Sequence, residues 1–170
     1  MSLTIRRIDY QDAADCAAVV FLLNQYAMHP MGQSKPLDDA ILERLPEALR
    51  SQPTAFAFLA EVEDEPAGIA TCFWGFSTFK ASRLINIHDL FVAEPHRGSG
   101  VGGKLIDAVK TFAVEQGSCA VTLEVVHENP ARAIYASKGF AGVQGDPKDL
   151  VYFGKCAVPF GQCSVAESES

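Results

Sequence analysis

The chain lacks a hydrophobic run long enough to cross a bilayer, although 48% of its 170 residues are hydrophobic. A membrane-spanning helix needs about 20 consecutive apolar residues. Met1 leads directly into an alternating stretch, Leu3–Ile8, so we also expect no secretory signal peptide. These absences predict a protein with no membrane partner, of a size that fits one domain with its own core.

Cysteine and basic charge are also scarce. The five cysteines have no CxxC spacing and no His/Cys/Asp grouping typical of a metal site, so we expect reduced thiols, a cytoplasmic location and no metal. The 14 Lys and Arg residues against 21 Asp and Glu give a net charge of -7. This balance argues against nucleic acid as a partner and favours a cationic small molecule.

Glycine, in contrast, is concentrated in one stretch. The apolar segment Asp89–Val92 runs through Pro95 into a loop with four glycines in six residues, and a pattern typical of a helix follows. Such a loop exposes backbone N–H groups at the positive end of a helix, and Arg97 adds a cation. The stretch predicts a phosphate-binding loop made of Arg97, Gly98, Ser99, Gly100, Val101, Gly102 and Gly103.

Three other interpretations of this loop are weaker. Gly98–Gly103 also satisfies G-x-G-x-x-G, with Glu124 about 20 residues further on, as in a dinucleotide site. The motif lies past the middle of the chain, however, and leaves no room for repeated βαβ units. A Walker loop would need Lys-Ser/Thr after the glycines, and a flexible linker would not stand between a strand and a patterned helix.

A fourth interpretation rests on Arg97-x-x-Gly100-x-Gly102, preceded by the run Val92–Arg97. This pattern resembles the acyl-CoA loop of the GNAT superfamily of N-acetyltransferases. The segment Asn129–Phe140 is similar to a second family motif, in which a tyrosine precedes Gly-Phe. Tyr135 matches that tyrosine, whereas Asn129 stands one residue nearer to it than in the family pattern.

The order of expected elements is also similar to the GNAT fold, an α+β fold, over residues 3 to about 156. Alternation and turn signals predict strands at 3–8, 55–62, 67–76 and 84–92, and helical periodicity predicts helices at about 12–26 and 37–50, the latter kinked or split at Pro46. A helix at 100–116 ends at Gly117, and strand 119–126 then runs parallel to 84–92. Asn129-Pro130 opens a further helix that Gly139 closes, and strands near 140–143 and 150–156 follow.

These elements predict a single domain over residues 1–158 and a polar, acidic tail over 159–170. The resemblance implies a mixed, mostly antiparallel sheet of about six to seven strands with about four helices. It also implies a V-shaped splay between strands 84–92 and 119–126.

Within the superfamily, the segments Phe76–Phe79, Ala60–Val62 and His88–Val92 are similar to the diamine (spermidine/spermine) N-acetyltransferases. His88 stands where that group has a glutamate. The resemblance implies acetyl-CoA as cosubstrate, a small primary amine as acceptor and a homodimer. It also implies that the coenzyme lies along Leu90, Phe91 and Val92, with its diphosphate on the glycine loop and Asn129 nearby.

The chemistry of amine acetylation assigns roles to three side chains. A primary alkylamine has a pKa of about 10.4, so roughly one molecule in a thousand is neutral at pH 7 and a general base is needed. We rank His88 as base above Asp89, because Asp89 faces the other side of an ideal strand unless a bulge intervenes. Tyr135 ranks above both, as the acid that protonates the CoA thiolate after direct attack by the amine.

Other functions stay open at this level. The domain could acetylate an amino acid, or the N-terminus or a lysine of a protein. A protein acceptor would require an open groove in place of a closed pocket, which the segment 27–36 and the helix after it decide. A different class of function is acyl-CoA binding without catalysis, by the same loop.

Overall fold

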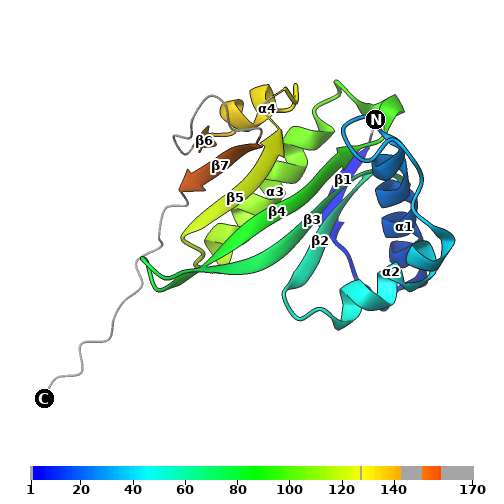
Figure 1. Cartoon of the computed structure of the whole chain (residues 1–170), viewed down its shortest axis with the longest axis horizontal. Helices are drawn as coiled ribbons and strands as arrows, with labels where there is room; N and C mark the ends of the chain where they lie inside the picture. The colour runs from blue at the N-terminus through cyan, green and yellow to red at the C-terminus, as the bar shows by residue number, and fades with distance from the viewer. Residues whose placement is uncertain (1, 127, 143–150, 158–170) are drawn as a thin grey trace, which may run out of the picture.

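The computed structural model describes residues 2–126, 128–142 and 151–157 and forms one seven-stranded sheet with helices on both faces (Figure 1). The strand order is β1-β2-β3-β4-β5-β7-β6. The elements are β1 (Leu3–Arg7), α1 (Ala13–Met28), α2 (Asp39–Ser51), β2 (Ala55–Val62), β3 (Glu65–Ser77), β4 (Ser82–Val92), the 3-10 turn η1 (Glu94–His96), α3 (Val101–Glu115), β5 (Ala120–Val126), α4 (Arg132–Ser137), β6 (Ala141–Gly142) and β7 (Val151–Ala157).

The sheet is antiparallel except at its centre, where β4 and β5 run parallel. Helix α3 connects these two strands, as a parallel crossover requires. The predicted α+β fold, its mixed sheet and its helices are thereby confirmed. The expected strands near 140–143 and 150–156 correspond to β6 and β7, whereas residues 143, 150 and the tail 159–170 lie outside the described residues.

Each face of the sheet has its own hydrophobic cluster. Helix α3 covers one face, where Leu105, Ile106 and Val109 are fully buried against side chains of β4 and β5. Helix α1 covers the other face through Val19 and Leu22. The functional consequence is a rigid sheet whose central strands present different side chains to two separate layers.

Helix α1 begins where the sequence predicts, because the Asp12 carboxylate accepts hydrogen bonds from the amides of Ala14 and Asp15. Helix α2 differs from expectation, since it continues without a break through Pro46. A proline removes one N–H donor from the helix interior, and here the remaining bonds and the amphipathic face keep the helix in one piece. The turn between β2 and β3 is Glu63–Asp64, both with positive φ (53° and 65°), which is the geometry of a type I′ hairpin.

The parallel contact between β4 and β5 is only three residue pairs long: Ile85–Val121, Asn86–Thr122 and Ile87–Leu123. At the same point β4 contains a bulge, because Cys72 of β3 lies opposite Ile87 while Thr71 lies opposite Asp89. His88 is therefore the extra residue. Beyond Ile87 the two strands no longer pair, which confirms the predicted splay.

Within the described ranges, none of the helices combines the length and apolar character of a membrane-spanning segment.

Candidate active site

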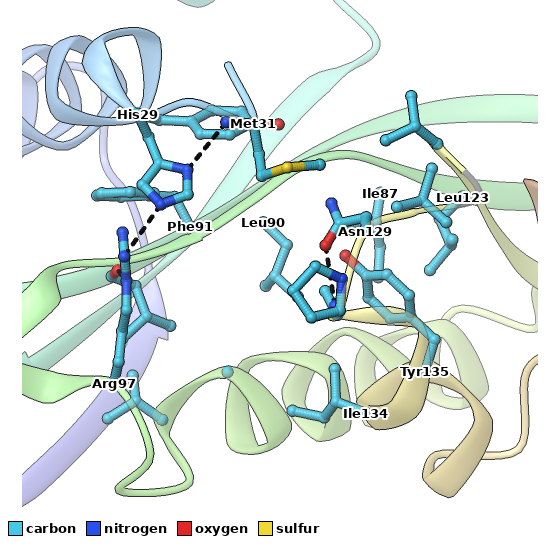
Figure 2. A pocket seen from close by; sticks show the side chains of 18 of the residues that line it. His29, Met31, Ile87, Leu90, Phe91, Arg97, Leu123, Asn129, Ile134 and Tyr135 are labelled. Carbon is cyan, nitrogen blue, oxygen red and sulfur yellow. Dashed lines mark hydrogen bonds between the residues drawn. The ribbon is translucent and has the colours of Figure 1, made fainter. Parts of the chain in front are cut away.

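A cleft of about 840 Å³ occupies the space where β4 and β5 diverge (Figure 2). Its walls come from the end of β4, from β5 and from α4, and the glycine loop and the C-terminal end of α1 close its two sides. Several elements far apart in sequence therefore meet at one hollow, which is a common arrangement for a ligand site.

The glycine loop forms an open backbone surface at one end of this cleft. Gly98 and Gly100 have φ values of 76° and 87°, which side chains rarely adopt, and no heavy atom lies within 4 Å of a Cβ built on either residue. Helix α3 begins at Val101, directly after Gly100, so its first N–H groups point into the loop. This open, positively polarised surface fits the diphosphate of a coenzyme.

The other residues of the predicted loop have different surroundings. Gly102 lines the cleft, whereas Ser99 and Gly103 do not. A Cβ on Gly103 would lie 3.1 Å from Cε of Lys138, so the missing side chain allows α4 to approach α3. Ser99 Oγ donates a hydrogen bond of 2.6 Å to the His96 carbonyl and so stabilises the turn itself.

Arg97 ties the glycine loop to the first half of the chain. Its Nε donates to the Val92 carbonyl at 2.9 Å, and its guanidinium lies over the Phe91 ring, 5.4 Å from the centroid. In a third contact, a terminal nitrogen of the Arg97 guanidinium lies 3.1 Å from His29 Nε2 (Figure 2). The side chain is nevertheless exposed and lines the cleft beside the glycines, where its charge can act on an anion.

The His29 ring lies between two hydrogen-bond donors, although a neutral imidazole has only one acceptor nitrogen. Its Nδ1 accepts the amide N–H of Met31 at 3.1 Å, while Nε2 faces the Arg97 guanidinium. A neutral imidazole has only one nitrogen without a proton. It can therefore accept from Met31 or from Arg97 but not from both at once.

Tyr135 enters the cleft from α4, with its phenol oxygen directed into the hollow (Figure 2). The side chain is buried, and its ring packs edge-on against Phe140. Gly139, with φ of 84°, ends the helix so that the Phe140 amide bonds back to the Tyr135 carbonyl. Burial, with a smaller contribution from Tyr26, raises the pKa of Tyr135 to about 12, so the phenol stays protonated.

Asn129 also lines the cleft, but it does not cap α4 as expected. Its Oδ1 accepts the amide of Ala131 at 2.9 Å, and helix α4 begins only at Arg132. The intervening residues form i→i+3 hydrogen bonds, from Arg132 to Asn129 and from Ala133 to Pro130. A tight 3-10 turn therefore precedes the helix, which the sequence pattern does not distinguish from a first α-turn.

His88 and Asp89 lie on the same side of the sheet because of the bulge. The His88 ring packs edge-on against Phe73 of β3, and the Asp89 carboxylate accepts from the hydroxyl of Thr71, which lies two residues before Phe73 on β3. The ideal-strand expectation that Asp89 faces away is therefore corrected. Of these two residues, only His88 lines the cleft. Asp89 bonds twice to the Thr71 hydroxyl, since its carboxylate accepts from Oγ1 and its amide N–H donates to Oγ1 at 3.1 Å.

The sequence argument missed several residues of this cleft. Tyr26 and Met31 come from α1 and the loop after it, and no motif marks them; Tyr26 has a raised pKa, mainly because of burial and also because of Asp89. Leu90, Phe91 and Val92 pair with β3 but not with β5 and line the cleft, and the Val92 carbonyl already accepts from Arg97. In the described ranges no three His, Cys, Asp or Glu side chains are grouped as metal ligands.

Comparisons with known proteins give this geometry a family. Residues 21–140 match the acetyltransferase (GNAT) family. The chain is 31% identical over 128 residues to an uncharacterized N-acetyltransferase, YhfO, of Bacillus subtilis, covering 75% of this chain and 84% of that protein. It is also 27% identical over 139 residues to the thialysine N-epsilon-acetyltransferase of Bos taurus, covering 74% and 78% of the two chains.

A solved structure shares the fold. An aminoglycoside acetyltransferase from an uncultured soil metagenomic sample superposes with a TM-score of 0.70 at 24% identity, covering 85% of this chain and 92% of the other. The family match covers more than half of the residues. The chain belongs to the GNAT acetyltransferase family and is an N-acetyltransferase.

Proposed function

We propose that this enzyme transfers the acetyl group of acetyl-CoA to a primary amine of a small molecule, with a diamine or polyamine favoured, by direct attack in a ternary complex. The observation that carries the proposal is the cleft itself. It joins an open glycine surface at one end to a protonated phenol and an imidazole near the diverging strands. Both substrates would have access to one continuous hollow.

In this proposal the coenzyme's anionic end lies on the first turn of α3. The N–H groups after Gly100 and the Arg97 cation would hold the diphosphate, and Gly98, Gly100 and Gly102 keep the surface free of side chains that would fill it. The pantetheine arm would follow the part of β4 that does not pair with β5, from Val92 to Leu90. Apolar side chains in this part of the cleft, among them Ile134, would exclude water from the thioester.

The reacting groups are supplied from both sides of the sheet. His88 takes the proton from the ammonium, the neutral nitrogen attacks the thioester carbon, and the C–S bond breaks. The departing sulfur accepts the proton of Tyr135, and the second proton that the nitrogen loses as the amide forms restores the Tyr135 phenol, so CoA leaves as a thiol. A phenol with a pKa of about 12 is a weaker acid than the CoA thiol, normally near pKa 8.5, so the proton transfer from Tyr135 would accompany C–S cleavage, when negative charge develops on the sulfur.

A thiol-release assay across a panel of amines tests this function. Acetyl-CoA is supplied with mono-, di- and polyamines, an amino acid, an aminoglycoside and a peptide with a free N-terminus, and the liberated CoA thiol is measured. We expect the diamines and polyamines to give the highest kcat/KM. Preference for the peptide would replace the small-molecule proposal, and absence of thiol release with every acceptor would contradict it.

The role of His88 has its own measurement. In an H88Q variant, the acidic limb of the kcat/KM pH profile should move up toward the pKa of the amine, about 10.4, because only amine that is already neutral can then attack. The acetyl-CoA KM should change little, since His88 lies on the α1 side of the sheet, away from the glycine loop. An unchanged acidic limb would exclude His88 as the base.

A further inference from the structure

The charged groups of the cleft are separated along its length. Arg97 and His96 belong to the loop end, and His29 lies beside Arg97. Among the described residues that line the cleft, Glu124 alone has a carboxylate. An anionic group of a ligand is therefore attracted to the loop end of the cleft, and a cationic group of a ligand is attracted to Glu124.

Glu124 stands at the point where the strands begin to separate. It directly follows Leu123, which forms the last pair between β4 and β5 and is buried on the α3 face. Because side chains alternate along a strand, Glu124 projects to the α1 face, the same face as His88. The carboxylate is thus close to the bulge and on the side of the sheet from which the amine would approach.

The Glu124 carboxylate is held in place without being neutralised. The Asn86 amide nitrogen lies 3.1 Å from Oε2 and 3.4 Å from Oε1, and it also lies 3.2 Å from Thr122 Oγ1. This donor is neutral, and among the side chains of residues 2–126 and 128–142 no Lys or Arg forms an ion pair with Glu124. The carboxylate has lone pairs left to accept from a ligand.

The neighbouring surface is apolar. Tyr26, Phe91 and Val126 line the cleft on the α1 side of the sheet, where Glu124 projects. A short methylene chain can lie against such side chains with its charged end at a carboxylate. The combination is the one expected for a molecule with an ammonium at each end of an alkyl chain.

We propose that Glu124 is the residue that selects diamines, by binding the ammonium that is not acetylated. This inference rests on the proposed acetylation of small amines and adds the group that recognises the second charge. Asn86 acts as a positioning residue, because it fixes the rotamer of Glu124.

The experiment compares diaminobutane with butylamine, which has the same chain length and only one ammonium. In E124Q, the ratio of kcat/KM for diaminobutane to that for butylamine should fall about tenfold, as for loss of a partly solvated charged hydrogen bond. E128Q is the matched control, since Glu128 is exposed and outside the cleft lining, and there the ratio should stay within about twofold. Thermal melting of both variants confirms that the fold is retained.

The outcomes separate this inference from the function on which it rests. Thiol release with butylamine but an unchanged ratio in E124Q would leave the acetyltransferase proposal standing and overturn the role of Glu124. An equal loss for both amines would also overturn it, because Glu124 would then act on the reacting nitrogen. If no amine releases thiol from the unmodified enzyme, both proposals fail together.

Discussion

The Tyr135 side chain is buried away from water, and this burial bears directly on the proposed chemistry. Its phenol is buried, so its deprotonated form is disfavoured and its pKa is raised to about 12. A catalytic acid must be protonated before it acts. The acid form therefore persists well beyond the pH at which an ordinary tyrosine ionises, near 10.

We expect kcat to stay level from pH 8 up to about pH 10, since loss of the Tyr135 proton lies above this range. In Y135F, kcat should fall by roughly a hundredfold while the acetyl-CoA KM changes little. Steady-state kinetics over this pH range provide the measurement. An alkaline limb with a midpoint below 10 that vanishes in Y135F would contradict the assigned environment.

Individual residues also show how far sequence reasoning reaches. The turn glycines Gly98 and Gly100 could be predicted because a tight turn into a helix favours glycine, whereas Tyr135 was predicted from its resemblance to a family motif. Tyr26 could not, because a tyrosine on an amphipathic helix has the same pattern whether it packs in the core or faces a cleft. The position of Asp89 was likewise unpredictable, since a bulge shifts side chains between faces without leaving a sequence signal.

At the level of elements, the glycine loop combines strained backbone with open space. G100A should cost about 1 kcal/mol of stability, because φ of 87° is unfavourable for a residue with a Cβ. G117A is the matched variant: Gly117 has φ of 64°, also has no atom within 4 Å of a built Cβ, and lies at the far end of α3. Both variants should lose similar stability in urea unfolding.

Only G100A should alter coenzyme binding. Its new methyl group would occupy the space proposed for the diphosphate, so we expect the acetyl-CoA KM to rise by about tenfold or more, while G117A remains within about twofold. Equal acetyl-CoA KM values in the two variants would mean that the loop does not hold the coenzyme.

A second element-level feature is the clamp that joins β1, β2 and α1. The Arg6 guanidinium donates two bonds to Asp15, of 2.9 and 2.7 Å, and two to Glu61, of 2.9 and 3.0 Å. Asp15 is 3% exposed and also accepts the Asp9 amide. These hydrogen bonds, above all those from Arg6, lower the pKa of Asp15.

The lowered pKa fixes the sign of a pH effect. The stabilisation is present above the pKa of an unfolded aspartate, near 3.9, and is lost as pH falls through the lower folded value. D15A should destabilise the fold by about 2 kcal/mol at neutral pH, as Arg6 is partly exposed, and by less in acid. E47Q, which breaks the exposed pair with Arg50, should change the unfolding free energy by only a few tenths of a kcal/mol.

Most elements were predictable because their signals are local. The alternation of β2, the Asp12 cap of α1 and the glycine ends of α3 and α4 each follow from residue type and spacing. The late start of α4 and the unbroken α2 were not, since an i→i+3 turn has the same residue pattern as a first α-turn, and a helix can continue through a proline while its other hydrogen bonds remain. Boundaries were therefore less reliable than the identity of the elements.

Across the whole molecule, the net charge of -7 should attract dications more strongly than monocations. Raising the ionic strength from about 0.01 to 0.15 M shortens the Debye length from about 30 to 8 Å. We expect kcat/KM for diaminobutane to fall several-fold over this range, and that for butylamine to fall less. Equal slopes for the two amines would contradict long-range attraction of the acceptor.

The imidazole shared between Met31 and Arg97 links events at the two ends of the cleft. A diphosphate that draws the guanidinium toward the glycines leaves His29 free to serve the amide of Met31 alone. The segment after α1 then becomes more firmly held at the moment the coenzyme docks. Binding of acetyl-CoA would then fix the segment after α1, which lines the cleft through Met31. We therefore expect acetyl-CoA to bind first and the amine second.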